Sequence, residues 1–173
     1  MGWRSNWVNY FQKINETNGT RQQQLFPAAR PNFFNVDDSM TFNWPIRVYY
    51  EDTDSGGVVY YANYLKYMER ARTEYLRSLG FEQDGLIKTH NVIFVVRRVE
   101  LDYLKPARFN ELLEVRSVVI ECKKASLLFE QQVYRVDDNA LLCTGQIKIA
   151  CLLADSFKPC AIPSFITEKT CVN

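Results

Sequence analysis

Residues 49–64 read Tyr49-Tyr50-Glu51-Asp52-Thr53-Asp54-Ser55-Gly56-Gly57-Val58-Val59-Tyr60-Tyr61-Ala62-Asn63-Tyr64. They set three carboxylates and two adjacent glycines between a strand-like run and a long amphipathic helix. A carboxylate held in a tight turn beside a helix N-terminus can act as a base or as a nucleophile. The helix end also offers backbone N–H groups that can stabilise an oxyanion. The arrangement therefore suggests acyl-group chemistry.

The same region predicts the first elements of the fold. Residues 46–50 alternate as a strand, and residues 52–57 have the composition of a turn, in which two glycines can adopt positive φ. A helix is predicted from about Tyr61 to Leu79, because apolar residues recur there at i, i+3, i+4 and i+7. Gly80 stands where the residue after a helix C-terminus is expected.

After Gly85 the pattern is that of β-structure. Strand patterns cover Val92–Leu101, Leu112–Cys122, Leu127–Val136 and Leu141–Leu153, with a turn at Lys105–Arg108 and a hairpin loop at Asp137–Asn139. Successive strands with short links form antiparallel sheets, and a single long helix must cover the apolar face. We therefore predict an α+β fold, in which an antiparallel sheet of about five strands wraps around one long central helix.

Length and composition set limits on the function. The chain has 173 residues, 47% of them hydrophobic, which is enough for one domain with a real core. Its 21 basic and 20 acidic residues give a formal net charge of +1. This balance does not favour nucleic acid or an anionic membrane as the main partner.

The first 39 residues differ in composition from the rest of the chain. Residues 1–39 carry three consecutive glutamines, scattered asparagine and isolated aromatics without a sustained period. We predict a poorly ordered N-terminal extension over 1–39 and a folded domain over 40–173; the alternative is that the extension is an integral first element. A chain that begins at Met40 is expected to fold and to stay active.

The five cysteines, Cys122, Cys143, Cys151, Cys160 and Cys171, are odd in number and lack CxxC spacing. With His90 as the only histidine, a zinc site would lack its usual ligands, and we predict no metal. Reduced thiols in a cytoplasmic protein are the expected state. Cys143 and Cys151 are expected to pack in the core or the sheet. The sequence also lacks a long apolar run that could span a membrane.

The order of elements and the turn sequence resemble the hotdog fold, and most closely its 4-hydroxybenzoyl-CoA thioesterase-like family. The similarity covers Thr41 to Ile166. It is carried by the segments Arg47–Tyr60, Ala62–Glu74 and Phe94–Arg98, together with Tyr103 and Pro106–Arg108. The first two segments are similar to the signature of acyl-CoA thioesterases encoded beside the bacterial Tol-Pal system.

The sequence departs from this family at one position. Many members carry a histidine directly after the Val-Val-Tyr run, where this chain has Tyr61. A mechanism that relies on an imidazole there does not transfer. Other branches of the superfamily have an aromatic residue at this helix start, where the backbone N–H polarises the thioester carbonyl.

The resemblance places the catalytic carboxylate at Asp54, as general base or nucleophile; the alternative is a turn residue or helix cap. Backbone N–H groups around Val59 to Tyr61 are the expected oxyanion donors. Tyr50 could orient the carboxylate or the substrate, or be only a half-buried strand aromatic. The predicted catalytic residues are thus Asp54, Tyr50 and Tyr61. The predicted substrate contacts are Gly57, Val58, Val59, Tyr60, Arg97 and Arg108, the two arginines for the phosphates of coenzyme A.

The resemblance implies a cytoplasmic thioesterase that hydrolyses short-chain acyl-CoA without a cofactor. It implies a homo-oligomer, a dimer or a tetramer of paired dimers, with acyl carrier protein or lipid-synthesis enzymes as further partners and no nucleic acid. Two alternatives stay open. One is a non-catalytic module that binds acyl carrier protein or acyl-CoA, and the other is a thioesterase for aromatic acyl-CoA of the 4-hydroxybenzoyl type.

Overall fold

The computed structural model describes residues 41–171. The predicted N-terminal extension over 1–39 and its boundary with the domain lie outside the described residues. Within residues 41–171, none of the helices combines the length and the apolar composition that a membrane-spanning helix needs.

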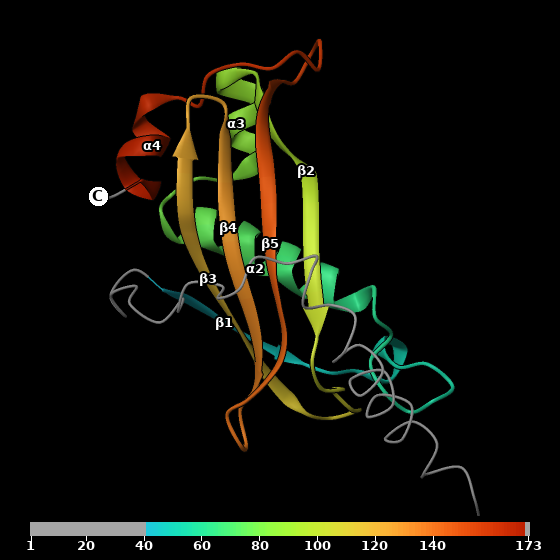
Figure 1. Cartoon of the computed structure of the whole chain (residues 1–173). Coiled ribbons are helices and arrows are strands. Elements are labelled where there is room, and N and C mark those ends of the chain that lie inside the picture. Colours follow the sequence, from blue (N-terminus) through green and yellow to red (C-terminus); the bar gives the residue numbers. More distant parts are fainter. Residues whose placement is uncertain (1–40, 172–173) are drawn as a thin grey trace, which may run out of the picture. The chain divides into compact units, whose positions relative to one another are not determined.

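One antiparallel sheet forms the framework (Figure 1). Its strands are β1 (Phe42–Arg47), β2 (Val92–Tyr103), β3 (Leu112–Lys123), β4 (Ser126–Arg135) and β5 (Ala140–Leu153), in the spatial order β1-β3-β4-β5-β2. The prediction of an antiparallel five-strand sheet is confirmed. The last four strands agree with the predicted ranges to within two residues at each end, because their turns and alternation are clear in the sequence.

The long helix α2 (Asn63–Ser78) crosses one face of this sheet (Figure 1). Its buried face meets the apolar face of the sheet in a single core. The core includes Tyr64, Tyr67, Met68 and Ala71 from the helix and Leu113, Val115, Phe129, Val133 and Ile147 from the sheet. Gly80 follows the helix with φ 89°, as its position predicted.

A buried polar link joins α2 to the sheet. Arg72, which is 9% exposed, donates from Nη1 to Oε1 of the fully buried Gln131 at 2.6 Å. The Gln131 amide in turn donates to the Met68 carbonyl at 3.0 Å and to Ser117 Oγ at 2.8 Å. Burial lowers the pKa of Arg72 to about 10. Because buried polar groups must pair, this link restricts where the helix can lie on the sheet.

Three parts of the fold differ from the prediction. Helix α3 (Gln83–His90) spans Gly85, where only β-structure was expected, and α4 (Ser164–Thr170) follows the sheet. Both helices are too short to show a clear period, and the interior Gly85 disfavours a helix, so packing rather than propensity holds them. The first strand ends at Arg47, and residues 50–52 form the 3₁₀ helix η3 (Tyr50–Asp52) instead of its continuation.

The expectation of five reduced thiols is wrong for two of them. Cys122 at the end of β3 and Cys171 after α4 form a disulfide that joins positions 49 residues apart. No sequence motif indicates this pair, because its two members meet only when α4 folds back onto the sheet. Cys143 and Cys151 are free and fully buried on β5, as predicted.

Candidate active site

The predicted site lies on the loop of residues 50–62, which connects β1 to α2. Asp54 occupies the exposed tip of a tight turn, where its N–H donates to the Val58 carbonyl at 2.9 Å. Gly57 takes a left-handed φ of 70°, and its N–H donates to the Asp54 carbonyl at 3.0 Å. The two glycines predicted as turn residues therefore lie in that turn.

The Asp54 carboxylate is oriented by its own turn. Its Oδ1 accepts a hydrogen bond from the Gly56 N–H at 2.7 Å. A side chain at Gly56 would place its Cβ only 3.0 Å from the same Oδ1, so a larger residue there would displace the carboxylate by a few tenths of an ångström. Among residues 41–171, the other carboxylate oxygen accepts no hydrogen bond. It therefore has its lone pairs available for water or a substrate.

Hydrogen bonds to the main chain hold the two sides of the loop together. The Asp52 carbonyl accepts from the Tyr60 N–H and from Asn63 Nδ2, each at 2.9 Å. The Val59 N–H donates to the Ala107 carbonyl at 2.8 Å. These bonds tie the turn to the first turn of α2 and to the segment after β2, so the carboxylate has a fixed place relative to the helix.

The same bonds narrow the choice of oxyanion donor. Of the three predicted N–H groups, those of Val59 and Tyr60 are already used within the fold. The Tyr61 N–H has no acceptor among residues 41–171. Tyr61 directly precedes Ala62, the N-cap of α2, where unpaired N–H groups and the helix dipole favour negative charge.

Aromatic side chains surround the loop and stay exposed to solvent. Tyr50 is 81% exposed and packs edge-on against Phe109 at 6.0 Å between ring centroids. The alternative that Tyr50 is a half-buried strand residue is therefore wrong. The Tyr61 ring lies 4.6 Å from that of Tyr60 and 6.4 Å from that of Tyr103. The Tyr103 hydroxyl donates to the Tyr61 carbonyl at 3.0 Å, and the neighbouring Tyr61 side chain raises the pKa of Tyr60.

The carboxylates beside Asp54 have different environments. Asp52 is buried, and its Oδ2 accepts from the Tyr49 N–H at 2.8 Å, as a turn cap does. Burial, and next the nearby Asp52 charge, raise the pKa of the Tyr67 phenol. Glu51 is exposed. Asp54 thus combines exposure, a free oxygen and proximity to the helix start, whereas Asp52 is committed to the fold.

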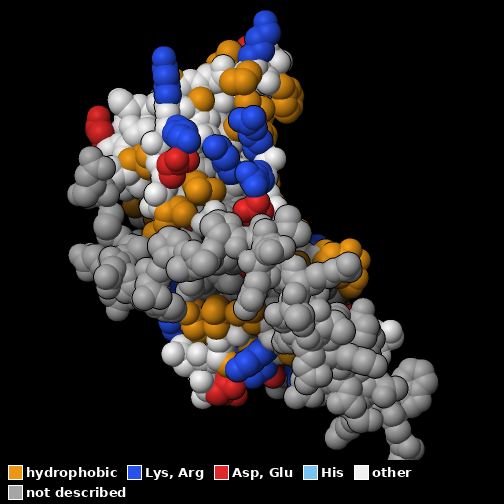
Figure 2. Space-filling model, viewed as in Figure 1, with side chains coloured by type: hydrophobic (Ala, Val, Ile, Leu, Met, Phe, Trp, Pro, Cys, Tyr) orange, Lys and Arg blue, Asp and Glu red, His pale blue; other side chains and the backbone are white. Residues whose placement is uncertain are grey.

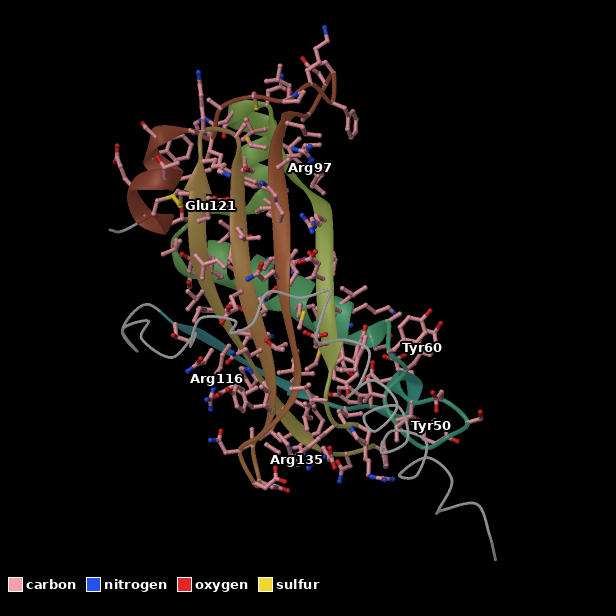
Figure 3. All side chains as sticks on the ribbon, in the orientation of Figure 1. Tyr50, Tyr60, Arg97, Arg116, Glu121 and Arg135 are labelled. Carbon is pink, nitrogen blue, oxygen red and sulfur yellow. A yellow bond between two sulfur atoms is a disulfide. The ribbon has the colours of Figure 1, made fainter. Side chains whose placement is uncertain are left out.

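The two predicted arginines lie in different places. Arg108 is exposed and follows Ala107, whose carbonyl holds the loop. Arg97 lies six residues before Tyr103 on β2, which corresponds to about 20 Å along a strand. Figure 3 likewise shows Arg97 far from Tyr50 and Tyr60. One chain therefore brings Arg108, but not Arg97, to the loop.

Basic side chains gather at one end of the sheet. Figure 2 shows several Lys and Arg side chains gathered over the end of the sheet where β2 begins, with acidic side chains among them. Among residues 41–171, no group of three or more His, Cys, Asp or Glu side chains could hold a metal ion.

Sequence reasoning missed the residues that support the loop. Asn63 is buried in the first turn of α2 and binds the Asp52 carbonyl. The buried Tyr64 hydroxyl accepts from the Ala107 N–H at 2.9 Å, and burial raises the Tyr64 pKa to about 12. An asparagine at the predicted start of an apolar helix was the only signal, since polar residues there often bind nearby backbone.

Comparisons with known proteins identify the family. Residues 48–170 match the Thioesterase-like superfamily. The chain belongs to this superfamily. It is similar to the acyl-CoA thioesterase YbgC of Haemophilus influenzae, with 47% identity over 70% of this chain and 88% of the relative. It is also similar to the acyl-CoA thioester hydrolase YbgC of Escherichia coli, with 42% identity over 74% and 94% of the two chains.

A solved structure agrees with this assignment. The crystal structure of a probable thioesterase from Bartonella henselae is 32% identical and aligns with a TM-score of 0.67, over 71% of this chain and 99% of the other. The predicted hotdog fold and thioesterase family are therefore confirmed.

Proposed function

We propose that this chain is an acyl-CoA thioesterase. In it, Asp54 activates the attacking water or attacks the thioester carbonyl itself, and the Tyr61 N–H stabilises the oxyanion. The reaction converts an acyl-CoA and water into a carboxylic acid and coenzyme A. The observation that carries the proposal is that one short loop presents a carboxylate with a free oxygen and an unpaired N–H at a helix start. Relatives at 42–47% identity carry the name of this activity.

The geometry suggests how the charges develop. The thioester carbonyl oxygen would accept from the Tyr61 N–H, so the negative charge of the tetrahedral intermediate forms beside the positive end of α2. Asp54 either removes a proton from the attacking water or attacks the carbonyl itself, and water then hydrolyses the anhydride. Both routes require the ionised carboxylate. The thiolate of coenzyme A leaves and takes a proton from solvent.

A second copy of the chain would complete the site. The outer edge of β2 is unpaired within the described residues, and its Val96, Val99 and Tyr103 are 37–50% exposed. Val96 and Val99 also line an open hollow of about 400 Å³ together with Leu65 and Glu69 of α2. Antiparallel pairing of two β2 edges would satisfy the free strand and cover these apolar side chains. We therefore propose a homodimer as the minimal active form.

Such pairing would also give Arg97 a role. In an antiparallel pair related by a two-fold axis near Glu100, Arg97 of a second copy lies opposite Tyr103, which contacts Tyr61. The predicted contact between Arg97 and the phosphates of coenzyme A therefore needs the dimer, whereas Arg108 can act from its own chain. Gly57, Val58, Val59 and Tyr60 stay proposed contacts of the acyl and pantetheine parts.

One observation favours the aromatic alternative for the substrate. The exposed rings of Tyr60, Tyr61 and Tyr103 form a cluster at the proposed oxyanion donor. Aromatic acyl groups stack on such rings in offset or edge-on geometry. Short-chain acyl-CoA is the first proposal, and an aromatic acyl-CoA is the second.

The test is release of free thiol from short-chain, long-chain and aromatic acyl-CoAs, followed with a chromogenic reagent. Asp54→Asn should lower kcat/KM about a thousandfold or more, because it removes the general base or nucleophile. Its matched control is Asp137→Asn, an exposed turn aspartate between β4 and β5, which should keep full activity. Equal activity of Asp54→Asn and wild type would overturn the mechanism.

Binding of acyl-CoA or acyl carrier protein by a folded chain that turns over no substrate would favour the non-catalytic alternative. Cytoplasmic location, a tetrameric assembly, association with the Tol-Pal system and absence of a cofactor stay predictions.

A further inference from the structure

The end of β5 and the segment that leads to α4 place two free cysteines opposite each other. Leu152 and Pro159 form an antiparallel bridge, so Cys151 and Cys160 are the next cross-strand pair. The Cys160 N–H donates to the Cys151 carbonyl at 3.0 Å. Their sulfur atoms are 3.5 Å apart. Figure 1 shows this segment running from the end of β5 across to α4.

The two thiols differ in access. Cys160 is partly exposed, whereas Cys151 is fully buried and also lies 3.8 Å from the Ala161 carbonyl. Burial raises the pKa of the Cys151 thiol to about 12. A dissolved oxidant would therefore meet Cys160 first, and Cys151 would react second, from within the protein. Cys143, the third free cysteine, lies eight residues from Cys151 on the same strand, about 26 Å away.

We propose that Cys151 and Cys160 form a second disulfide when the protein meets a small-molecule disulfide such as oxidised glutathione. The Cys160 thiolate attacks one sulfur of the oxidant, and one glutathione thiolate leaves. The Cys151 thiolate then displaces the second glutathione from Cys160. Two protein thiols and one oxidised glutathione thus give one protein disulfide and two reduced glutathiones. The sulfur atoms need to approach by about 1.5 Å to reach a disulfide bond length of about 2.05 Å.

With the new bond, both ends of the C-terminal segment would be held by disulfides. Cys160 lies at the start of the segment that carries α4, and Cys171 at its end is already joined to Cys122. Between them, Phe165 packs on Phe81 with ring centroids 5.7 Å apart, and Lys169 donates to the Leu79 carbonyl at 2.8 Å. Oxidation therefore fixes both ends of the segment that covers α3 and the end of α2.

The test uses the full chain in buffers with a rising proportion of oxidised to reduced glutathione. After denaturation and alkylation, trypsin should release residues 149–169 as one peptide, because the Lys158–Pro159 bond resists cleavage. This peptide holds only Cys151 and Cys160. With oxidation it should change from two alkylated cysteines to none, with the mass of two hydrogens lost. The number of alkylated thiols per chain should fall from three to one.

Matched variants separate the pair from the remaining thiol. Cys143→Ser should keep the mass change, and Cys160→Ser should abolish it. Thermal unfolding should shift upward by several degrees on oxidation in wild type and in Cys143→Ser, but not in Cys160→Ser. A peptide that stays fully alkylated at the highest oxidant, or one that keeps glutathione on Cys160, would overturn the proposal. So would a new bond to Cys143.

Discussion

The loop of residues 50–62 is held by hydrogen bonds and by the buried Val59, and it leaves its aromatic side chains exposed. The cap of residues 154–171, in contrast, is fixed by a disulfide. In the loop, the Asp52 and Ala107 carbonyls accept the bonds that fix the turn. In the cap, a disulfide joins Cys171 to β3, and Ile162 and Ile166 are buried. The two regions lie at opposite ends of β2, whose Tyr103 contacts Tyr61 and whose start pairs with Leu153.

This difference indicates that the loop serves the proposed reaction and that the cap serves the stability of the fold. The cap buries Ile162 and Ile166 against its own chain, whereas the loop end presents exposed rings that a substrate or a second copy could cover. Changes in the cap should therefore alter the free energy of unfolding and spare the reaction. Changes in the loop should do the reverse.

The largest expected effect is on the cap. Cys171→Ser should lower the free energy of unfolding by about 4 kcal/mol, because the disulfide closes a loop of 49 residues in the unfolded chain. Denaturant unfolding would measure this loss, and kcat/KM should stay within about twofold of wild type. Cys122→Ser should cost the same, and the double variant should cost no more than either. A loss of activity in the folded variant would contradict the expectation that changes in the cap spare the reaction.

The next effect is on the loop. Tyr61→Pro removes the proposed oxyanion donor and should lower kcat about a hundredfold. Proline also restricts the backbone of Tyr60, so thermal unfolding must stay within a few degrees of wild type for the comparison to count. Retained activity in a folded Tyr61→Pro chain would remove this N–H from the mechanism.

Alkaline pH should lower the free energy of unfolding, through buried groups that lie near both regions. Burial raises the pKa of Cys143 and of Cys151 from 9.0 to about 12, and that of Tyr64 from 10.0 to about 12. The unfolded chain loses these protons at lower pH than the folded chain. Stability is thus fully present below pH 9 and lost as the pH rises toward 12, by about 1.4 kcal/mol per pH unit for each group in its range.

Denaturant unfolding between pH 8 and 11 would measure this slope. Cys143→Ala, on β5 near the loop, and Cys151→Ala, on β5 next to the cap, should each reduce this slope by a similar amount above pH 9. If neither variant changes the slope, the loss of stability at alkaline pH does not come from these two buried thiols.

Sequence reasoning reached the framework because its signals are local. The alternation of residues in β3 and β5 and the 3.6-residue period of α2 are visible in short windows, and so were the turn glycines beside Asp54. The cap was missed for the opposite reason. Helix α3 carries a glycine in its interior, α4 has only seven residues, and the Cys122–Cys171 bond depends on both being in place.

The site was predicted more coarsely than the fold. The carboxylate and the helix start could be placed from the motif, but three N–H groups stayed equivalent until the bonds of Val59 and Tyr60 removed two of them. Likewise, Arg97 and Arg108 both lie in segments that resemble the family. Only the length of β2 shows that Arg97 lies far from the loop of its own chain. Which polar groups are already paired is a property of the folded chain, so no motif could have shown it.

The smallest expected effect sharpens the comparison within the loop. Tyr61→Phe keeps the backbone N–H, the aromatic ring and the Tyr61 carbonyl that accepts from Tyr103. If the main chain at this position polarises the thioester, kcat should stay within about threefold of wild type, in contrast to the hundredfold loss of Tyr61→Pro. Steady-state kinetics on the preferred acyl-CoA would measure both. A Tyr61→Phe loss as large as that of Tyr61→Pro would show that the phenol takes part, as the side chain that stands where the family resemblance leads us to expect a histidine.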